Sequence, residues 1–360
     1  LFQKYMERIR NGDTEAMNEM GLIFQNSKDN ENAKKWYLRA IEKNDFSYAN
    51  NLGYLYAGEK DYENAKKYYL IAIKHNDFNA LTNLAVLLQD NKKFEEAEKF
   101  YLKAIELEDI EALNNLGKLY RERKRYKEAE ERFKEAIFKG NSGALNELGY
   151  LYQIQKRYEE AEKYYLKSIK LGNAVSLYNL GDLCQEQERY KEAEKYYLKA
   201  IELGNVDAIN YLGVLYENIG RYEEAEEKFK QAATKGNIHA PSNLGNIHYR
   251  KGDYENSEEY YITASLKGNE YALNNLEELY YKQERYEDLE NIYRKVLKKG
   301  HNSVIDKLGD FCFNQNKLEK AEEYFLELIE KGNGKAAAKL GELYRKAGNN
   351  EKAEKYYEIA

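Results

Sequence analysis

The chain has 360 residues, of which 33% are charged and 42% are hydrophobic, and its net charge is -6. This composition excludes a membrane span, because no stretch approaches the run of about 18 apolar residues that a spanning helix needs. Both signs of charge are interspersed and the balance is acidic, so we expect no nucleic-acid partner. A single proline predicts almost continuous helix.

The predicted elements begin with residues 1–11, which match the late part of a helix that recurs along the chain and indicate a partial repeat. From there a glycine position returns every 32 residues, with Ala85 and Glu277 in the two places that lack glycine. The glycines of this row are Gly21, Gly53, Gly117, Gly149, Gly181, Gly213, Gly245, Gly309 and Gly341. A fixed period of this length predicts stacked units that contact only their neighbours. We therefore expect one array of eleven repeats over residues 1–360, with a truncated last helix.

One repeat, residues 175–205, shows the helices expected in every unit. Apolar residues spaced three and four apart predict a first helix that begins at Val175 and a second helix that begins at Tyr190, with a short polar turn between them. Gly204 and Asn205 end the unit, because glycine adopts the left-handed conformation that closes a helix and asparagine caps the next one.

Small residues predict where the two helices of a pair touch. A glycine inside a helix costs about 1 kcal/mol relative to alanine, so its return in nine repeats indicates a close approach there. In the sixth repeat, Ala193 follows Gly181 by twelve residues and Tyr197 follows it by sixteen; a Tyr or Phe holds this last place in all eleven repeats. Aromatic residues at helical spacing are typical of a core. The prediction is an all-α fold, an α-α superhelix or solenoid of eleven helix-turn-helix repeats.

This pattern resembles the tetratricopeptide repeat (TPR), whose motif is Leu-Gly, then Tyr, Ala, Tyr or Phe, and Ala at fixed distances. The matching residues of the sixth repeat are Leu180, Gly181, Ala193, Tyr197 and Ala200, with Cys184 at the first Tyr position. The unit has 32 residues instead of 34, and its Gly-Asn junction, which replaces the family proline, is similar to that of Sel1-like repeats. The resemblance implies a helical scaffold for protein interactions.

The ninth repeat departs from this pattern at three small positions, where it has Glu277, Leu289 and Val296. A close-packed interior does not absorb such added volume without backbone movement, and a buried carboxylate needs a partner. We also place Pro241 at about the fourth position of the preceding first helix, where proline disturbs a helix. We predict that the ninth helix pair opens and that the bend of the array changes near residues 241–297. The alternative is a repeat that packs like the others.

Catalytic motifs are missing from the sequence. It has no Gly-rich phosphate loop, no HExxH and no GxSxG. Its four histidines are too scattered for a metal site, and His248 falls at a core tyrosine position. We therefore expect no enzyme activity, no cofactor and no metal.

The cysteines favour a cytoplasmic location. Cys184 and Cys312 lie four repeats apart, beyond disulfide reach, and we expect both to be buried thiols. The chain begins at Leu1 and not at Met, which suggests a piece of a longer protein and leaves a signal peptide or an anchor open.

Two rows of asparagine follow the polar side of the first helices. The row two residues before the glycine position contains Asn51, Asn83, Asn115, Asn179, Asn243 and Asn275. The row three residues before it contains Asn18, Asn50, Asn114, Asn146, Asn210 and Asn274. The TPR resemblance implies that this side lines a concave groove and that the first row binds a peptide main chain, to which a carboxamide offers donors and an acceptor. An equally weighted alternative is that these amides bond the neighbouring repeat.

Tyrosines and charges complete the predicted groove. The tyrosines assigned to it are Tyr150, Tyr178, Tyr211 and Tyr249, and tyrosine is a common hot-spot residue at protein interfaces. Acidic residues dominate the groove of the first seven repeats and basic residues that of the last four, so a ligand with a basic segment is expected. The alternative is a solvated helix face with incidental charge.

The leading function hypothesis is a non-enzymatic scaffold that binds an extended peptide or a partner protein in its concave groove. The alternative is the regulatory or targeting arm of a larger enzyme or sensor. An RNA-binding repeat would need a basic groove, which the first seven repeats do not offer. The partner and the oligomeric state stay open.

Overall fold

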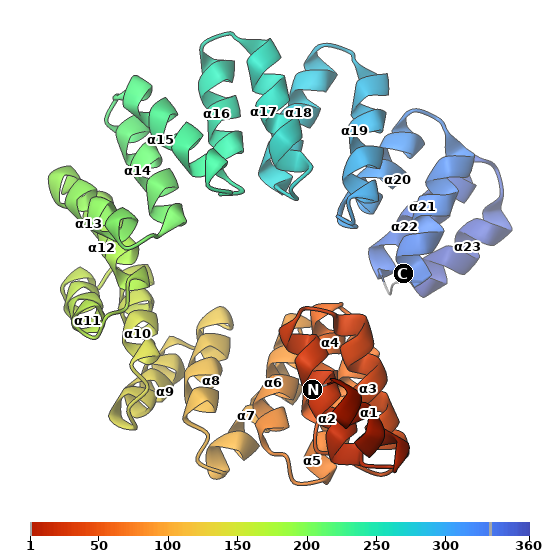
Figure 1. Ribbon diagram of the computed structural model, residues 1–360. Helices are drawn as coiled ribbons and strands as arrows, with labels where there is room; N and C mark the ends of the chain where they lie inside the picture. The colour runs from red at the N-terminus through yellow and green to blue at the C-terminus, as the bar shows by residue number, and fades with distance from the viewer. Residues whose placement is uncertain (1, 331–332) are drawn as a thin grey trace. The chain divides into compact units, whose positions relative to one another are not determined.

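A computed structural model describes residues 2–330 and 333–360, and Figure 1 shows helices joined by short turns. No strand occurs among the described residues. The chain divides into two compact units, Leu1–Leu183 and Cys184–Ala360, with the boundary inside one helix. The prediction of an all-α solenoid of helix pairs is confirmed. That of one array over residues 1–360 stays a prediction.

The first unit contains a leading helix, α1 (Phe2–Arg10), and five helix pairs. These pairs are α2 (Thr14–Asn26) with α3 (Asn30–Glu42), α4 (Ala49–Gly58) with α5 (Tyr62–Lys74), α6 (Asn79–Asp90) with α7 (Phe94–Glu106), α8 (Ile110–Glu122) with α9 (Tyr126–Phe138), and α10 (Gly143–Ile154) with α11 (Tyr158–Lys170). Helix α12 (Val175–Glu186) contains the unit boundary. Helix α1 lies against α2, at the place of the predicted partial repeat, whose first residue is outside the described residues.

The second unit continues with α13 (Tyr190–Glu202) and five further helix pairs. These pairs are α14 (Val206–Asn218) with α15 (Tyr222–Thr234), α16 (Ala240–Arg250) with α17 (Tyr254–Ser265), α18 (Glu270–Lys282) with α19 (Tyr286–Lys298), α20 (Val304–Asn314) with α21 (Leu318–Glu330), and α22 (Gly334–Lys346) with α23 (Asn350–Ile359). The even-numbered helices from α2 to α22 are the first helices of the repeats, and the odd-numbered helices from α3 to α23 are the second helices.

The glycine row exists because an aromatic ring occupies the space where a side chain would begin. A Cβ on Gly117 would lie 2.5 Å from the ring of Phe133, and the other described glycines of the row would place a Cβ 2.4–2.8 Å from the aromatic residue sixteen positions later. Phe133 is completely buried. The predicted core role of the aromatic row is therefore confirmed in the first ten repeats, whereas Tyr357 in the last helix is 42% exposed; Cys184 and Cys312 are buried as expected.

The turns use the left-handed backbone region twice in each of the first nine repeats. Gly204 closes one repeat with a φ of 84°, and the side chain of Asn205 then accepts a bond from the Ala208 amide at 2.9 Å, as predicted. Inside the repeats, the turn between first and second helix places residues such as Lys124 at a φ of 58°. The sequence analysis recognised this turn as polar but missed its left-handed residue.

The eighth repeat corrects one expectation. Helix α16 begins at Ala240, so Pro241 is its second residue and not about its fourth. Proline is tolerated there because the first amides of a helix have no partner within the helix. Asn237 caps the helix by accepting bonds from the amides of His239 and Ala240. The proline therefore fits the helix start and does not disturb the helix interior.

The ninth pair is open, as predicted. Helices α18 and α19 approach each other closely at far fewer positions than the helices of the other pairs given above. Glu277 stands at the glycine position of this pair, and Leu289 and Val296 are buried at the alanine positions. The Glu277 carboxylate accepts from Lys307 at 2.7 Å, so the partner that a half-buried carboxylate needs is present. The predicted change of bend remains a prediction.

Candidate functional site

The first helices crowd together on one side of each unit. Helix α4 contacts α6, α6 contacts α8 and α8 contacts α10, and in the second unit α16 contacts α18. Successive second helices make less contact with one another. The crowded side of a bent stack is its concave side. We call the solvent-facing surface of the first helices in each unit the first-helix face.

Every residue predicted to line the groove lies on a first helix. The asparagines nearer the glycine position are half-buried, whereas Asn114, Asn146 and Asn210 of the other row are buried. Asn274 is exposed. Half-buried amides can contact solvent and a neighbouring helix at once, so their hydrogen bonds decide between the two roles weighed above.

Most of these side-chain amides form hydrogen bonds with a neighbouring repeat, and we call these bonds the asparagine ladder. The Nδ2 of Asn83 donates to Asn50 at 2.9 Å, Asn179 donates to Asn146 at 2.8 Å, and Asn243 donates to Asn210 at 2.9 Å. The alternative in which these amides bond the neighbouring repeat is therefore observed. Each ladder bond uses one of the two Nδ2 hydrogens and leaves the donor residue its Oδ1. The ligand role of the rows stays a prediction.

In the second and ninth repeats the donor of the ladder bond has a different partner. Asn51 donates to Gln25 at 3.4 Å. In the ninth repeat Asn275 would meet Ser242 at the regular acceptor position, and it donates instead to Asn246 at 3.0 Å. The Ser242 hydroxyl is buried with no hydrogen-bond partner.

The ladder is interrupted at α8. Asn114 is only 5% exposed and its Oδ1 has no hydrogen-bond partner, because the next first helix presents Glu147, which cannot donate, at the ladder position. Asn115 has no side-chain bond among the described residues. Its regular acceptor position holds Thr82, whose hydroxyl donates to Asp109 at 2.6 Å. The amides of α8 thus keep hydrogen-bonding capacity that the other ladder positions use.

The tyrosines present partly exposed rings on the same face. Tyr150 is 42% exposed and lies under the guanidinium of Arg121, 4.9 Å from its ring centroid. Tyr211 is 37% exposed and stacks on Tyr197. Tyr178 and Tyr249 are half-buried. Fixed aromatic surface of this kind can contact a ligand at low entropic cost.

A cavity of about 200 Å³ opens on the first-helix face of the second unit. Helices α16, α17 and α18 form it. Its lining residues are Asn246, Tyr249, Arg250, Tyr261, Tyr271, Asn275 and Glu278. Tyr249 and Asn275 were predicted groove residues and Tyr261 belongs to the predicted core row of aromatic residues, whereas Asn246 was not predicted.

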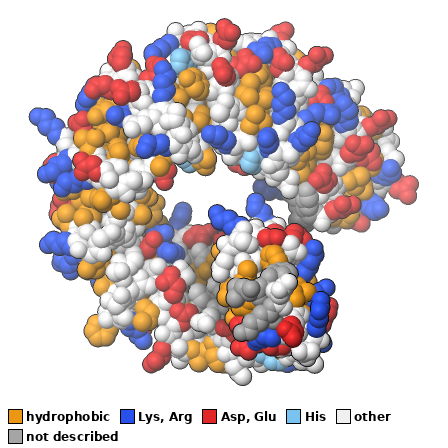
Figure 2. Space-filling view, viewed as in Figure 1, with side chains coloured by type: hydrophobic (Ala, Val, Ile, Leu, Met, Phe, Trp, Pro, Cys, Tyr) orange, Lys and Arg blue, Asp and Glu red, His pale blue; other side chains and the backbone are white. Residues whose placement is uncertain are grey.

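Many charges of the first-helix face are paired across neighbouring helices, and both signs are interspersed over the surface in Figure 2. Glu147 accepts from Arg121 at 2.5 Å in the first unit. In the second unit Lys339 contacts Asp306 and Asp310, each at 2.8 Å. These ion pairs neutralise part of the acidic excess predicted for the groove of the first seven repeats and part of the basic excess predicted for the last four.

Asp182 on α12 is an exception. Gln153 donates to its carboxylate at 2.9 Å, and no cation pairs with it among the described residues. Burial is the main cause that raises the pKa of the Asp182 carboxyl above its ordinary value, and the Gln153 bond opposes the shift. A basic ligand group would find an uncompensated carboxylate here.

Sequence reasoning missed a cluster that recurs at several junctions between neighbouring repeats, which we call the clasp. Between the third and fourth repeats, Glu98 on α7 accepts from the Tyr120 hydroxyl at 2.7 Å and from Arg125 at 2.8 Å. Burial first and the Glu98 bond second raise the pKa of Tyr120 to about 12. Equivalent tyrosine bonds are Tyr152 to Glu130, Tyr216 to Glu194, Tyr280 to Glu258, and Tyr344 to Glu322. The recurring Tyr, Glu and Arg positions were the available signal.

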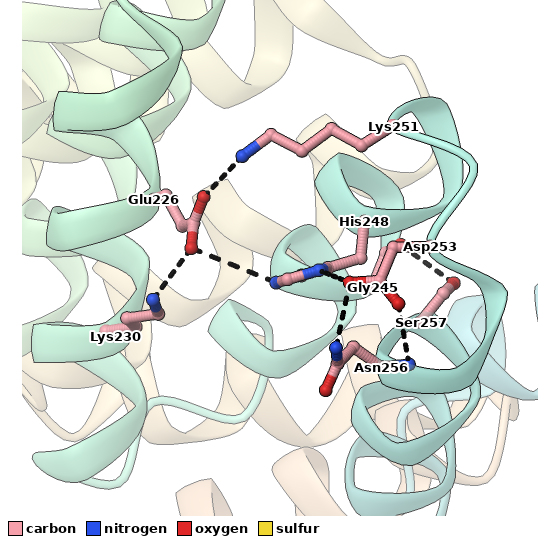
Figure 3. A network of polar contacts seen from close by, with 8 residues as sticks. All are labelled: Glu226, Lys230, Gly245, His248, Lys251, Asp253, Asn256 and Ser257. Atoms are coloured by element: carbon pink, nitrogen blue, oxygen red, sulfur yellow. Dashed lines mark hydrogen bonds and ion pairs between the residues drawn. The ribbon is translucent and has the colours of Figure 1, made fainter.

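The clasp of the eighth repeat has different members (Figure 3). His248 replaces the tyrosine, and its Nδ1 lies 2.8 Å from Asp253, which replaces the arginine. Its Nε2 is buried without a hydrogen bond, 3.8 Å from Glu226. Bonds from Lys230 and then Lys251, both at 2.7 Å, lower the pKa of Glu226 to about 2. The structural role expected for His248 agrees with this position.

No described helix is long and apolar enough to cross a membrane. The described residues also contain no group of three or more His, Cys, Asp or Glu side chains suited to hold a metal ion.

Comparison with known proteins identifies the repeat. Models described as tetratricopeptide repeat match residues 14–43, 46–74, 76–137, 142–205, 174–234, 242–270, 272–302 and 307–360. No curated protein matches the chain.

Solved structures share the fold. A tetratricopeptide repeat protein from Parabacteroides merdae is 18% identical with a TM-score of 0.51, over 64% of this chain and 97% of that one. A protective antigen of uropathogenic Escherichia coli with an SLR fold is 22% identical with a TM-score of 0.47, over 96% and 83%. A Sel1 repeat protein from Oxalobacter formigenes is 26% identical with a TM-score of 0.47, over 60% and 99%.

The glycine–aromatic contacts, the left-handed turns and the matches along most of the chain lead to one conclusion. The protein is a helical-repeat scaffold of a kind that serves protein interactions, and it belongs to the tetratricopeptide repeat family.

Proposed function

We propose that the protein is a non-enzymatic scaffold whose first-helix face binds an extended peptide segment of a partner protein. The observation that carries the proposal is the unused hydrogen-bonding capacity of the ladder donors, together with the unpaired amide of Asn115. A peptide main chain offers N–H and C=O groups at every residue, so a row of amides can bind it largely independently of its side chains.

Charge supports a basic segment opposite the first unit. Asp182 lacks a cation partner, and Asp90 is exposed on α6. Lys or Arg side chains of a ligand would compensate these carboxylates. Because charges more than about 10 Å apart are screened at 0.1 M salt, affinity is expected to fall as salt concentration rises. The buried free thiols of Cys184 and Cys312 favour a reducing compartment such as the cytoplasm.

A random-peptide phage library panned on the immobilised chain supplies the test ligand. The affinity of a selected peptide is then measured by fluorescence anisotropy for two matched variants. Tyr211→Ala removes a partly exposed ring from the first-helix face, and Tyr222→Ala removes a 49% exposed ring at the start of a second helix. We expect Tyr211→Ala to weaken binding about tenfold and Tyr222→Ala to leave it unchanged.

Thermal unfolding of both variants shows whether a loss of affinity reflects a loss of fold, since Tyr211 also stacks on Tyr197. Equal losses of affinity in the two variants, or a loss only in Tyr222→Ala, would place the ligand elsewhere and refute the proposal.

A further inference from the structure

The cavity on α16, α17 and α18 arises from one change in a regular contact. In other repeats the core tyrosine donates its hydroxyl to a glutamine four residues after the glycine position: Tyr37 to Gln25 at 2.7 Å and Tyr101 to Gln89 at 3.0 Å. The eighth repeat has Tyr249 at the glutamine position. The Tyr261 hydroxyl donates instead to Asn246, three residues closer to the N-terminus, at 2.7 Å.

The hydrogen bonds around Asn246 fix the orientation of two amides. The Oδ1 of Asn246 accepts from Tyr261 and from the Nδ2 of Asn275 at 3.0 Å, so this atom is an oxygen with both lone pairs used. The Asn246 Nδ2 and the Asn275 Oδ1 make no bond within the described residues. A donor and an acceptor therefore remain on two bonded side chains that both line the cavity.

The walls of the cavity are aromatic. Tyr249 and Tyr261 contribute to the lining, and Tyr271 on α18 is 59% exposed at its rim. Lys282 donates to the Tyr249 hydroxyl at 3.0 Å and lies over the ring, 5.6 Å from its centroid. The Tyr249 ring is thereby held in place beside the two amides.

The charges near the cavity balance one another. Arg250 pairs with Glu217, and Glu278 pairs with Lys282 at 2.6 Å. A charged ligand group would gain no uncompensated partner here and would lose its hydration. A neutral, planar group with one acceptor and one donor fits both the free amide atoms and the aromatic walls.

We propose that this cavity is a binding site for a neutral primary carboxamide, the side-chain end of a glutamine or asparagine in the bound segment. The carbonyl oxygen of the ligand accepts from Asn246 Nδ2, and its NH₂ group donates to Asn275 Oδ1. The inference rests on the proposed function, because it assigns one side-chain preference to the same peptide. A cavity of about 200 Å³ accommodates the end of one side chain.

The test uses small probes on the whole chain labelled with ¹⁵N-asparagine. Propionamide represents the side-chain carboxamide, N-methylacetamide a main-chain amide, and propionate and propylammonium the charged alternatives. Single Asn→Ser variants assign the side-chain NH₂ signals of Asn246 and Asn275. We expect propionamide alone to shift both signals in a saturable way. No shift with propionamide, or an equal shift with any other probe, would overturn the proposal.

Tyr249→Gln is the matched variant. It introduces the glutamine that the first, third, fifth and sixth repeats have at this position, so the fold should be kept while the Tyr261 hydroxyl bonds position 249 and the amide pair is rearranged. We expect the apparent propionamide affinity to fall roughly tenfold, as the loss of one or two neutral hydrogen bonds implies. Tyr222→Gln, on α15 and outside the cavity lining, should leave it unchanged. An unchanged affinity in Tyr249→Gln would also contradict the proposal.

The two proposals fail separately. If propionamide binds in a saturable way but no selected peptide depends on the first-helix face, the amide site stands and the proposed peptide function is refuted. A selected peptide that depends on the first-helix face but tolerates replacement of each of its glutamines and asparagines by glutamate would keep the function and remove the amide site.

Discussion

The fourth repeat and the eighth repeat contact the repeats before them through equivalent positions, and the side chains at those positions differ. At the fourth, Glu98 receives a tyrosine hydroxyl and an arginine. At the eighth, Glu226 receives two lysines and faces a histidine that is bonded to an aspartate. At the junction between the first and second repeats, the equivalent position on α3 holds a cation, Lys34, which pairs with Glu59 at 2.6 Å. The comparison teaches that this junction requires a paired charge and not particular side chains.

A second difference separates these regions. The fourth repeat has Gly117 where the ninth has Glu277, Tyr120 where the eighth has His248, and Arg121 where the eighth has Tyr249. The changes coincide with the open ninth pair and with the cavity. The predictions below test whether the two regions differ in energetics as they differ in contacts.

The largest effect is expected from Gly117→Ala. The added Cβ would lie 2.5 Å from the buried Phe133 ring, so backbone or ring must move, at a cost of about 3 kcal/mol in the free energy of unfolding. At the same position of the open ninth pair, Glu277→Ala removes the ion pair with Lys307 and the interaction with the buried Tyr293 hydroxyl but creates no steric clash, so it should cost about 1 to 2 kcal/mol, less than Gly117→Ala. Urea unfolding of both variants measures the difference. Equal costs would mean that the ninth pair is as tightly packed as the fourth.

The next effect is the acid sensitivity of the junction between α15 and α16. The pKa of Glu226 lies at about 2 in the folded protein, below its ordinary value of 4.5. Its ionised form therefore stabilises the fold above pH 4.5, and this contribution is lost as the pH falls through about 2. Relative to Glu226→Gln, the wild type should be about 2 kcal/mol more stable at pH 7. The gap should close in acid. A gap that does not depend on pH would exclude charge as its cause.

His248→Tyr should stabilise the chain by about 1 kcal/mol. The Nε2 of His248 is buried without a hydrogen bond, and a tyrosine hydroxyl at this position would donate to Glu226 as in the other clasps. Asp253 would keep its bonds from Asn256. Differential scanning calorimetry should show a higher melting temperature. The reciprocal variant, Tyr120→His, should show a lower one, and a fall in both would indicate that the eighth junction prefers its histidine.

The smallest stability effect is expected at the interrupted ladder. Asn243→Ala removes a bond to Asn210 and should cost about 1 kcal/mol, whereas Asn115→Ala removes no bond and should leave stability unchanged. The selected peptide should respond in the opposite order, with the larger loss of affinity in Asn115→Ala. If Asn115→Ala changes neither stability nor affinity, the amides of α8 have no role in binding.

The fold was readable from the sequence because its main constraint is local and repeated. Gly117 and Phe133 are sixteen residues apart in one repeat, and the same spacing returns throughout. The position of Pro241 was misjudged because the start of α16 depends on how Asn237 caps it, which spacing alone does not reveal.

The site was only partly readable. The asparagine rows and their helix face follow from the period, but the bond from Asn243 to Asn210 joins different repeats and depends on how closely neighbouring first helices approach. The cavity depends on Tyr249 in place of a glutamine whose bonding role becomes visible only in three dimensions. The clasp likewise joins a second helix to the next first helix, so its members are far apart in sequence.

The open ninth pair has a mechanical consequence. When a helical stack is pulled along its length, the load passes through each helix pair in turn, and the pair with the fewest close contacts is expected to open first. The backbones of α18 and α19 approach each other closely at fewer positions than those of α14 with α15, α16 with α17, α20 with α21 and α22 with α23. Release of one 32-residue repeat would lengthen the tether by up to about 110 Å at the reach of an extended chain. The substitutions of glycine and alanine in this repeat thus give the second unit a point of early extension under tension.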